Sequence, residues 1–360
     1  MKSDHLYALV LAGGRGTRFW PRSRRRRSKQ VLQFLGAESL LQETVARLEK
    51  LLPRERVWVL TNEHLRDEIL RQLPGVPRRQ ILAEPVQRNT APAIGVAAKI
   101  LFEADRDAVM GVFPADQHIG RPAAFSKTLR AAYRAAADGR MAIVGIVPRW
   151  AETGYGYIEF PSGGMKPGSL EPVEIVRFRE KPDPETARLF VEAGHFGWNA
   201  GVFFWRADVF LNALHEHLPQ TAALLDTLPR FGGRAFTAKL AELFPQCENI
   251  SVDFAVLERA KGVVGFAAGD VGWSDVGSWS AVYDLLPKDA QGNAACSEAL
   301  FERASGNLVD VPGRLVALLG VDDLIVVETP DALLVARREQ AQRVSDVVLE
   351  LEKQKRDELL

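Results

Sequence analysis

The stretch YALVLAGGRGTRFW, residues 7–20, decides the fold. Its first half, residues 7–12, is a continuous apolar run, which is typical of a strand buried on both faces of a parallel sheet. Its second half turns on Gly13, Gly14 and Gly16, which allow a tight bend and let backbone N–H groups approach a ligand closely. Such a turn directly after a first strand is suited to bind phosphate. It matches neither GxGxxG nor the P-loop pattern, so it supports neither a dinucleotide-binding fold nor a P-loop.

Strand-like and helix-like segments alternate from this stretch to about residue 147. Ser39 is a candidate N-cap, and Gln42 three residues later completes a capping box at the start of the first helix. Strands separated by helices of this length predict right-handed βαβ units and an α/β fold, a Rossmann-like, mostly parallel sheet with helices on both faces. The predicted strands are 57–60, 80–83, 108–113 and 141–147, and the predicted helices are 39–52, 63–73, 91–102 and 123–137.

The pattern changes twice along the rest of the chain. Strands are expected at 155–160, 173–178 and 201–205, with irregular helical packing over 211–244. After about residue 287 the apolar stretches become short and β-branched, which predicts a small all-β region followed by a final helix at 340–353. We therefore expect a large domain over residues 1–286 and a small C-terminal domain over 287–360.

Composition limits the classes of function. Lys plus Arg and Asp plus Glu both number 46, so the zero formal net charge provides no general field for nucleic acid or an anionic membrane. No stretch approaches the roughly 20 apolar residues of a membrane span, and the N-terminal apolar run is too short for a signal peptide. Cys247 and Cys296 lack CxxC spacing, which argues against a disulfide scaffold or a zinc site. We expect a cytoplasmic protein that binds neither nucleic acid nor membrane.

Cationic side chains follow the glycine turn. Arg18 lies beside it, and a run of four arginines at 24–27 leads to Lys29. An arginine run alone is more often a solvated loop or a nucleic-acid patch. Its place just after a glycine turn at a strand end favours binding of a triphosphate, because guanidinium and ammonium groups suit polyphosphate oxygens.

Two aspartates are candidates for a divalent metal site. Asp116 follows the strand at 108–113, and Asp275 lies in the segment GWSDVGSW. Ligands gather at the carboxyl ends of parallel strands, and Mg²⁺ is commonly held by one or two carboxylates together with substrate phosphates. The alternative for Asp116 is a turn or helix-capping role, which is common for Asp after a strand.

Two further polar segments have both structural and functional interpretations. Asn89 and Thr90 either cap the helix that follows them or supply polar groups to a nucleotide base. Glu180 and Lys181 form either a surface ion pair or a pair in which the carboxylate accepts sugar hydroxyls and the ammonium binds a phosphate.

The segment LAGGRGTRFWPRSRRRRSKQ resembles the GGxGTR…PK signature of nucleoside-diphosphate-sugar pyrophosphorylases, and most of all that of bacterial mannose-1-phosphate guanylyltransferases. FPADQHI, EPVQRNTAP, GYGYI, EKP, WNAG and GWSDVGSW resemble further motifs of these enzymes in the same order. Residues 307–336 resemble their small, β-helix-like C-terminal domain. Arg22, Ser28 and Gln117 depart from the pattern, which has an apolar residue, a proline and a histidine there.

The resemblance implies a set of site residues. Arg18 and Lys29 are expected to touch the triphosphate, and Asp116 and Asp275 are expected to hold Mg²⁺ jointly. Nucleotide contacts are implied for Ala12, Gly13, Gly14, Gly16, Thr17, Arg18, Asn89 and Thr90. Contacts to the sugar phosphate are implied for Gly156, Glu180, Lys181 and Asn199.

The leading hypothesis is transfer of GMP from GTP to mannose 1-phosphate, giving GDP-mannose and pyrophosphate. A second hypothesis keeps the class and changes the pair to glucose 1-phosphate with dTTP, UTP or ATP. A third is a non-catalytic regulator that binds sugar nucleotides, and a nucleic-acid binder built on the arginine run is a distant fourth. No stretch resembles the isomerase domain of longer relatives, so we expect a single activity. A homodimer is compatible with the sequence, which does not determine the oligomeric state.

Overall fold

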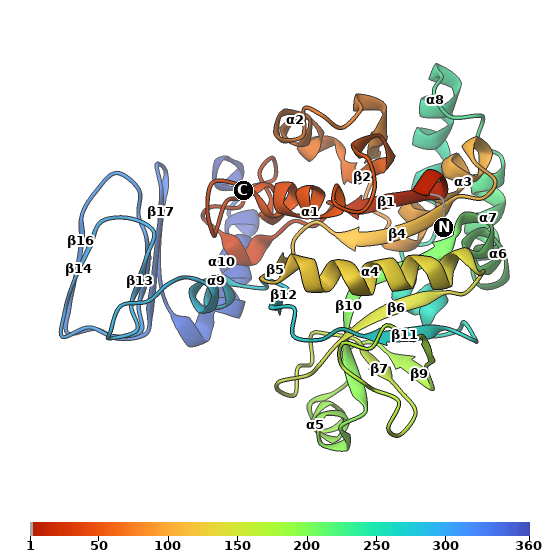
Figure 1. The fold of residues 1–360 in the computed structure, drawn as a ribbon. Helices are drawn as coiled ribbons and strands as arrows, with labels where there is room; N and C mark the ends of the chain where they lie inside the picture. Colours follow the sequence, from red (N-terminus) through yellow and green to blue (C-terminus); the bar gives the residue numbers. More distant parts are fainter. Residues whose placement is uncertain (1–2) are drawn as a thin grey trace.

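The computed structural model describes residues 3–360, and its centre is a ten-stranded sheet in which β1 lies between β2 and β4 (Figure 1). The strand order is β3-β2-β1-β4-β10-β6-β11-β8, with β7 and β9 attached beside β10. Strands β1 to β4 pair in parallel, whereas β10 runs antiparallel to both β4 and β6. The strands are β1 (Leu6–Leu11), β2 (Val57–Asn62), β3 (Ile81–Glu84), β4 (Val109–Pro114), β6 (Ala142–Ile146), β7 (Tyr157–Glu159), β8 (Val173–Glu174), β9 (Arg177–Arg179), β10 (Phe196–Arg206) and β11 (Val264–Ala267).

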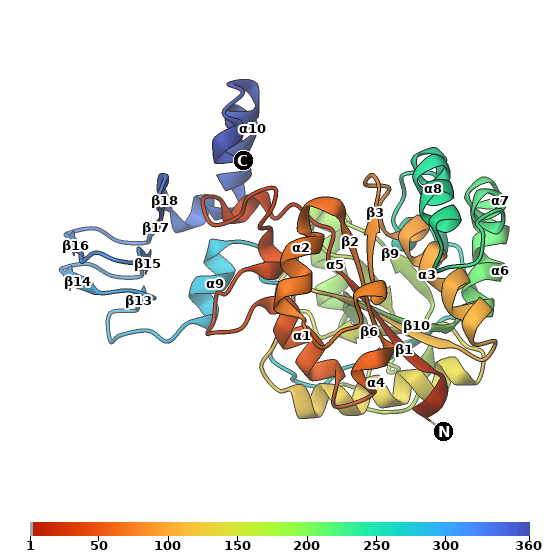
Figure 2. The same ribbon diagram turned by 90° about the horizontal axis from the view of Figure 1, so that it is seen from above.

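Helices cover both faces of this sheet (Figure 2). Apolar side chains of α1, α2, α4 and α5 form one core with the sheet, and those of α3, α6, α7 and α8 form a second core on the other face. The predicted α/β fold is therefore confirmed. The helices are α1 (Leu40–Leu48), α2 (Glu63–Gln72), α3 (Thr90–Ala104), α4 (Pro122–Ala137), α5 (Pro184–Ala193), α6 (Ala207–His217), α7 (Pro219–Asp226) and α8 (Arg234–Leu243).

The predicted capping box at the first helix is also confirmed. The Ser39 hydroxyl accepts from the Gln42 N–H at 3.2 Å, and the Gln42 side chain accepts from the Ser39 N–H at 2.9 Å. These two bonds satisfy N–H groups that the first turn of a helix leaves without partners.

Two predicted strands were wrong in extent. The expected strand at 173–178 is two short strands, because β8 pairs with β11 while β9 pairs with β7. The expected strand at 201–205 is the end of the longer β10, whose register shifts between Asn199 and Phe203. The irregularity includes Gly201, whose φ of +67° is accessible mainly to glycine.

The C-terminal region is a stack of short strands that stands apart from the sheet (Figure 1). Its strands pair in parallel with partners 14 to 17 residues along the chain, and β17 and β18 form an antiparallel hairpin. This repeat confirms the β-helix-like tail, while the boundary between residues 286 and 287 stays a prediction. The elements are α9 (Trp279–Leu285), β13 (Ala294–Ala295), β14 (Ala299–Glu302), β15 (Leu308–Asp310), β16 (Val316–Leu319), β17 (Leu324–Thr329), β18 (Ala332–Arg337) and α10 (Val344–Lys353).

The residues after the glycine turn pack against this C-terminal region. Phe19 and Trp20 are buried in a separate core that also contains Trp279 and the inner face of α10. The Trp20 ring N–H donates to the carbonyl of Leu359 at 3.0 Å, and the Trp279 ring N–H donates to the carbonyl of Trp20 at 3.1 Å. The C-terminal region therefore packs against, and stabilises, the segment for which the sequence predicts phosphate binding.

Candidate active site

The glycine turn, residues 12–18, is held by β2 and by the segment that follows β3. The Ala12 N–H donates to the Leu60 carbonyl at 2.8 Å, and the Thr61 hydroxyl donates to the Ala12 carbonyl at 2.9 Å. The Gln87 amide nitrogen donates to the Gly13 carbonyl at 2.8 Å. The turn is therefore fixed at the carboxyl end of the sheet, where open α/β folds bind ligands.

Two of its glycines are required by close packing. A Cβ on Gly14 would lie 2.9 Å from the side-chain amide of Gln30. Gly16 has a φ of +62°, and a Cβ there would lie 2.7 Å from the Cβ of Lys29. The glycines thus bring the turn against the residues that follow the arginine run. Thr17 begins the short 3-10 helix η2 (Thr17–Phe19).

Lys29 joins the two predicted metal aspartates. Its side chain is buried, and its Nζ donates to Oδ2 of Asp116 at 2.9 Å and to the backbone carbonyl of Asp275 at 2.6 Å. Ser28 precedes it with a φ of −79°, close to the value that a proline ring would fix. Ser28 therefore has a φ that a proline at this position could also adopt.

Asp116 and Asp275 meet although they are far apart in the sequence. The two-residue strands β5 (His118–Ile119) and β12 (Trp273–Ser274) pair antiparallel, with Ser274 opposite His118. This pairing sets the residues flanking the two strands, Asp116 and Asp275, close to each other. Joint binding of a metal by the two acids stays a prediction.

Gln117, the departure from the family pattern, has a structural role. Its amide nitrogen donates to the Ala200 carbonyl at 2.6 Å, and its amide oxygen accepts from the Trp273 ring N–H at 3.1 Å. The side chain thereby ties the Asp116 loop both to β10 and to the strand that leads to Asp275. An amide can do this with a single orientation because it carries a donor and an acceptor.

A cavity of about 610 Å³ opens beside the glycine turn, within the range typical of ligand sites. Five predicted residues line it: Gly13, Gly14, Asn89, Thr90 and Asp116. Several other side chains line this cavity and were not predicted as site residues, among them Gln30, Glu84, Gln87, Asn249 and Asp253.

The capping and binding interpretations of Asn89 and Thr90 do not exclude each other. The Asn89 side chain accepts from the Thr90 N–H at 3.0 Å at the start of α3, so Asn89 is a helix cap. Its φ of +62° is strained for a residue with a side chain, and such strain concentrates at functional sites. The Thr90 hydroxyl accepts from the Val252 N–H at 2.8 Å and so fixes the loop that carries Asp253.

The predicted sugar residues Gly156, Glu180 and Asn199 form a second group. A Cβ on Gly156 would overlap Oε2 of Glu180 and would lie 3.3 Å from the Cβ of Asn199. The Asn199 amide donates to Oδ1 of Asp253 at 2.9 Å, which connects this group to the cavity beside the glycine turn. Lys181 is more exposed, with its Nζ 3.7 Å from Oε1 of Glu180.

Glu180 is a buried carboxyl group with a raised pKa and one oxygen without a hydrogen-bond partner among residues 3–360. Burial, and then the neighbouring carboxylate of Asp253, raise the pKa of Glu180 to about 7, while Lys181 opposes this rise. Its Oε2 is buried and has no hydrogen-bond partner among residues 3–360. An unpaired buried carboxylate oxygen is costly unless a ligand hydroxyl satisfies it.

Asp253 is a functional candidate that the sequence did not reveal. It begins a π-helical turn, Asp253–Leu257, a rare geometry that is frequent at functional sites. Burial raises the pKa of its carboxyl group as well. The segment NISVDFAVLE contains no spacing pattern that points to this residue, because its place in the cavity depends on the loop that Thr90 holds.

The arginine run is not among the residues that line this cavity, and three arginines of the segment are paired with carboxylates. Their binding to a triphosphate stays a prediction. Arg22 forms a bidentate pair with Asp310, with both distances 2.8 Å. Arg24 pairs with Asp331 at 3.0 Å and Arg25 with Asp357 at 2.7 Å. These arginines bind carboxylates of the C-terminal region, so their charge fixes that region to the sheet domain.

Arg18 lies at the border between these two environments. Its Nη1 donates to the Gln342 side chain at 2.7 Å. Burial raises the pKa of the Tyr155 phenol, as does the neighbouring carboxylate of Asp275, whereas the charge of Arg18 lowers it. The only hydrogen bond of the Arg18 side chain among residues 3–360 is to the C-terminal region, and its contact with the triphosphate stays a prediction.

Comparison with known proteins shows the family of this chain. The model of the nucleotidyl transferase family matches residues 7–292, which is most of the chain. The chain belongs to the nucleotidyl transferase family. A second family model, the mannose-phosphate isomerase/GMP-like β-helix domain, matches residues 303–351.

Curated relatives of this nucleotidyl transferase cover nearly its whole length. The mannose-1-phosphate guanylyltransferase of Klebsiella pneumoniae is 38% identical over 98% of this chain and 75% of its own length. The alginate biosynthesis protein AlgA of Pseudomonas aeruginosa is 37% identical over 97% of this chain and 73% of its own length. The crystal structure of mannose-1-phosphate geranyltransferase from Thermus thermophilus superposes with a TM-score of 0.84 at 32% identity, over 97% of this chain and 99% of that one.

Proposed function

We propose that this nucleotidyl transferase joins GTP and mannose 1-phosphate to form GDP-mannose and pyrophosphate. Two of its relatives are guanylyltransferases or take part in alginate biosynthesis by name, which supports this pair of substrates. The observation that carries the proposal is Lys29, which contacts Asp116 and Asp275 at the edge of the cavity beside the glycine turn.

The donor set fits a divalent metal. Pairing of β5 with β12 brings the backbone of Asp275 beside the loop that carries Asp116, and we assign the metal to these two carboxylates. Residues 3–360 contain no cluster of three or more metal-ligating side chains that would form a site without substrate. Mg²⁺ suits such a site, because it is usually held by one or two carboxylates together with substrate phosphates and water. When bound there, it would neutralise charge on the triphosphate. The ammonium of Lys29 supplies a further positive charge from the chain itself.

The protein's own groups bind and orient the two substrates. The base and ribose are assigned to the 610 Å³ cavity near Asn89, Thr90 and the glycine turn. The sugar is assigned to Glu180 and Asn199, and the sugar phosphate to Lys181. Positioning is the main requirement, because the attacking phosphate has a second pKa of about 6 and is already largely dianionic at neutral pH. No general base is needed for this reason.

A screen of pyrophosphate release tests the proposal. GTP, dTTP, UTP and ATP are each combined with mannose 1-phosphate and glucose 1-phosphate, in the presence of Mg²⁺. The expected result is the highest kcat/KM for GTP with mannose 1-phosphate. Highest activity with another pair would support the second nucleotidyltransferase hypothesis. Binding of a sugar nucleotide without pyrophosphate release from any pair would support a non-catalytic regulator.

The proposal also includes where the protein acts and which molecules it binds. No helix within residues 3–360 is both long and apolar enough to cross a membrane. Cys247 and Cys296 are free thiols, which is compatible with the reducing cytoplasm in which we place the reaction. The proposed partners are the two small-molecule substrates.

A further inference from the structure

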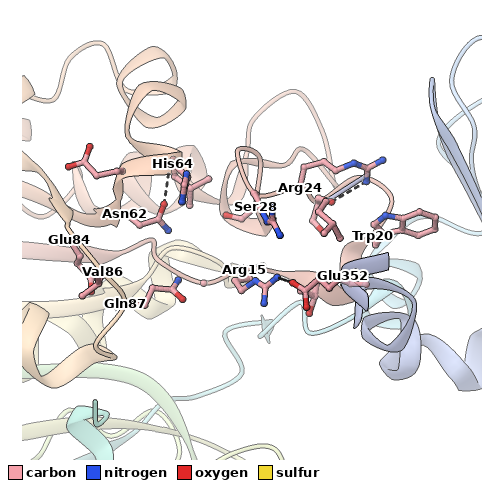
Figure 3. Close-up of a pocket in the computed structure, with 18 of the residues that line it drawn as sticks. Arg15, Trp20, Arg24, Ser28, Asn62, His64, Glu84, Val86, Gln87 and Glu352 are labelled. Atoms are coloured by element: carbon pink, nitrogen blue, oxygen red, sulfur yellow. Dashed lines mark hydrogen bonds and ion pairs between the residues drawn. The ribbon is translucent and has the colours of Figure 1, made fainter. Parts of the chain in front are cut away.

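Two arginines of the glycine turn are held by side chains from the end of the chain. Arg15 donates through its Nη2 to Oε1 of Glu352. Both residues line a cavity of about 460 Å³, in which Figure 3 marks the pair with a dashed line. Arg18 donates to the side chain of Gln342 at 2.7 Å. Gln342 belongs to the 3-10 helix η8 (Arg338–Arg343), and Glu352 belongs to α10.

The element that carries these partners is firmly anchored. Val344 and Val348 of α10 are buried in the core that also contains Phe19 and Trp20, directly after the glycine turn. The Trp20 ring N–H bonds to the Leu359 carbonyl beyond α10. These contacts keep Glu352 on α10, and Gln342 on η8 just before it, within reach of the turn.

These contacts compete with the expected ligand of the turn. A guanidinium that is bonded to a carboxylate presents fewer donors to a phosphate. A carboxylate beside the turn also repels a triphosphate, because both are negatively charged. A polyphosphate that binds these two guanidinium groups therefore competes with Glu352 and Gln342 for their N–H donors.

We propose that Glu352 and Gln342 act as an internal competitor for the polyphosphate, holding Arg15 and Arg18 until a nucleoside triphosphate or pyrophosphate replaces them. The inference rests on the proposed function, because it takes the glycine turn as the polyphosphate site. The C-terminal region then influences nucleotide affinity directly, in addition to stabilising the segment after the glycine turn.

Two substitutions with opposite expected effects test the inference. Glu352→Gln keeps the shape and removes the charge, so the Kd of GTP should fall by up to about fivefold, the limit for an exposed ion pair. Gln342→Glu strengthens the hold on Arg18 and adds a like charge, so the Kd of GTP should rise by a similar factor. Both Kd values are measured by calorimetry on the full chain without sugar phosphate, and again with inorganic pyrophosphate as the probe.

Matched controls lie on the same two helices. Glu350→Gln on α10 and Gln340→Glu on η8 make the same chemical changes at exposed positions, and both should leave the Kd values at the wild-type level. A purely structural role for the terminal helix would weaken binding in Glu352→Gln and Gln342→Glu alike, and this outcome overturns the proposal. Unchanged Kd values in both variants overturn it as well.

The pyrophosphate arm separates this inference from the proposed function. If pyrophosphate binding shows the expected opposite shifts but GTP and mannose 1-phosphate give no turnover, the inference stands and the proposed function fails. If turnover occurs without those shifts, the function stands and the inference fails. If the wild-type chain binds neither GTP nor pyrophosphate, both are overturned.

Discussion

The ammonium of Lys29 lies 2.9 Å from a carboxylate oxygen of Asp116, in the place where a triphosphate and its metal ion are expected to meet. The same ammonium accounts for the convergence of three segments, because its two partners lie 87 and 246 residues further along the chain. The buried ammonium thus ties the carboxylate of Asp116 to the backbone of Asp275.

Asp116→Asn should reduce turnover by about a hundredfold or more, because the charge stabilisation that a metal supplies is worth several kcal/mol. Asp275→Asn should have an effect of the same order. Pyrophosphate release is measured as a function of Mg²⁺ concentration, with Asp138→Asn at the exposed end of α4 as the matched control. Near-wild-type turnover in either variant at saturating Mg²⁺ would remove that residue from the metal site.

Glu180 should make sugar binding depend on pH. Burial and Asp253 raise the pKa of this carboxyl to about 7, so it changes from a protonated to an ionised group as the pH rises from about 6 to 8. The ionised form accepts sugar hydroxyls, so KM for mannose 1-phosphate should fall over this range.

The stability of the fold should decrease as the pH rises, whereas sugar binding becomes tighter. The folded state binds a proton on Glu180 that the unfolded chain loses above its ordinary pKa, so this contribution to the free energy of unfolding decreases as the pH rises through about 7. Glu180→Gln should flatten both profiles, leaving only the titration of the sugar phosphate itself. An identical pH dependence of KM in wild type and Glu180→Gln would exclude Glu180 from the sugar site.

Gly16→Ala should lower both stability and activity. The residue has a φ of +62°, which costs an L-residue about 1–2 kcal/mol, and the new Cβ would lie 2.7 Å from the Cβ of Lys29. Displacement of Lys29 should in turn reduce turnover. Gly36→Ala is the control, because a Cβ there has no atom within 4 Å. Equal unfolding midpoints and turnover for the two variants would contradict the tight packing of the turn on Lys29.

Asp310→Asn should destabilise the protein by about 1–3 kcal/mol, because it removes the charged partner of Arg22 at a buried position. Asp357→Asn breaks the exposed pair with Arg25, and it should cost less than about 1 kcal/mol. Urea unfolding followed by tryptophan fluorescence measures both free energies. If the two variants lose the same stability, the Arg22–Asp310 pair is no more than a surface contact.

The sequence by itself determined the features that depend on neighbouring residues. The apolar run at residues 7–12 gave the central strand, the Ser39 and Gln42 spacing gave the capping box, and the alternation of segments gave the sheet with helices on both faces. Each of these follows from periodicity or capping chemistry within a few residues, so no long-range information was needed. The motif order likewise gave the family, which the match over residues 7–292 confirms.

Only the tertiary structure decided which distant groups meet. The arginines of this segment are chemically suited to phosphate. Their carboxylate partners lie more than 280 residues away, and no local sequence pattern predicts these pairs. Asp253 enters the cavity because the Thr90 hydroxyl holds its loop, and Lys29 meets Asp275 because β5 and β12 pair. The chemistry of a side chain limits which groups it is able to bind. The path of the folded chain determines which of these groups lies next to it.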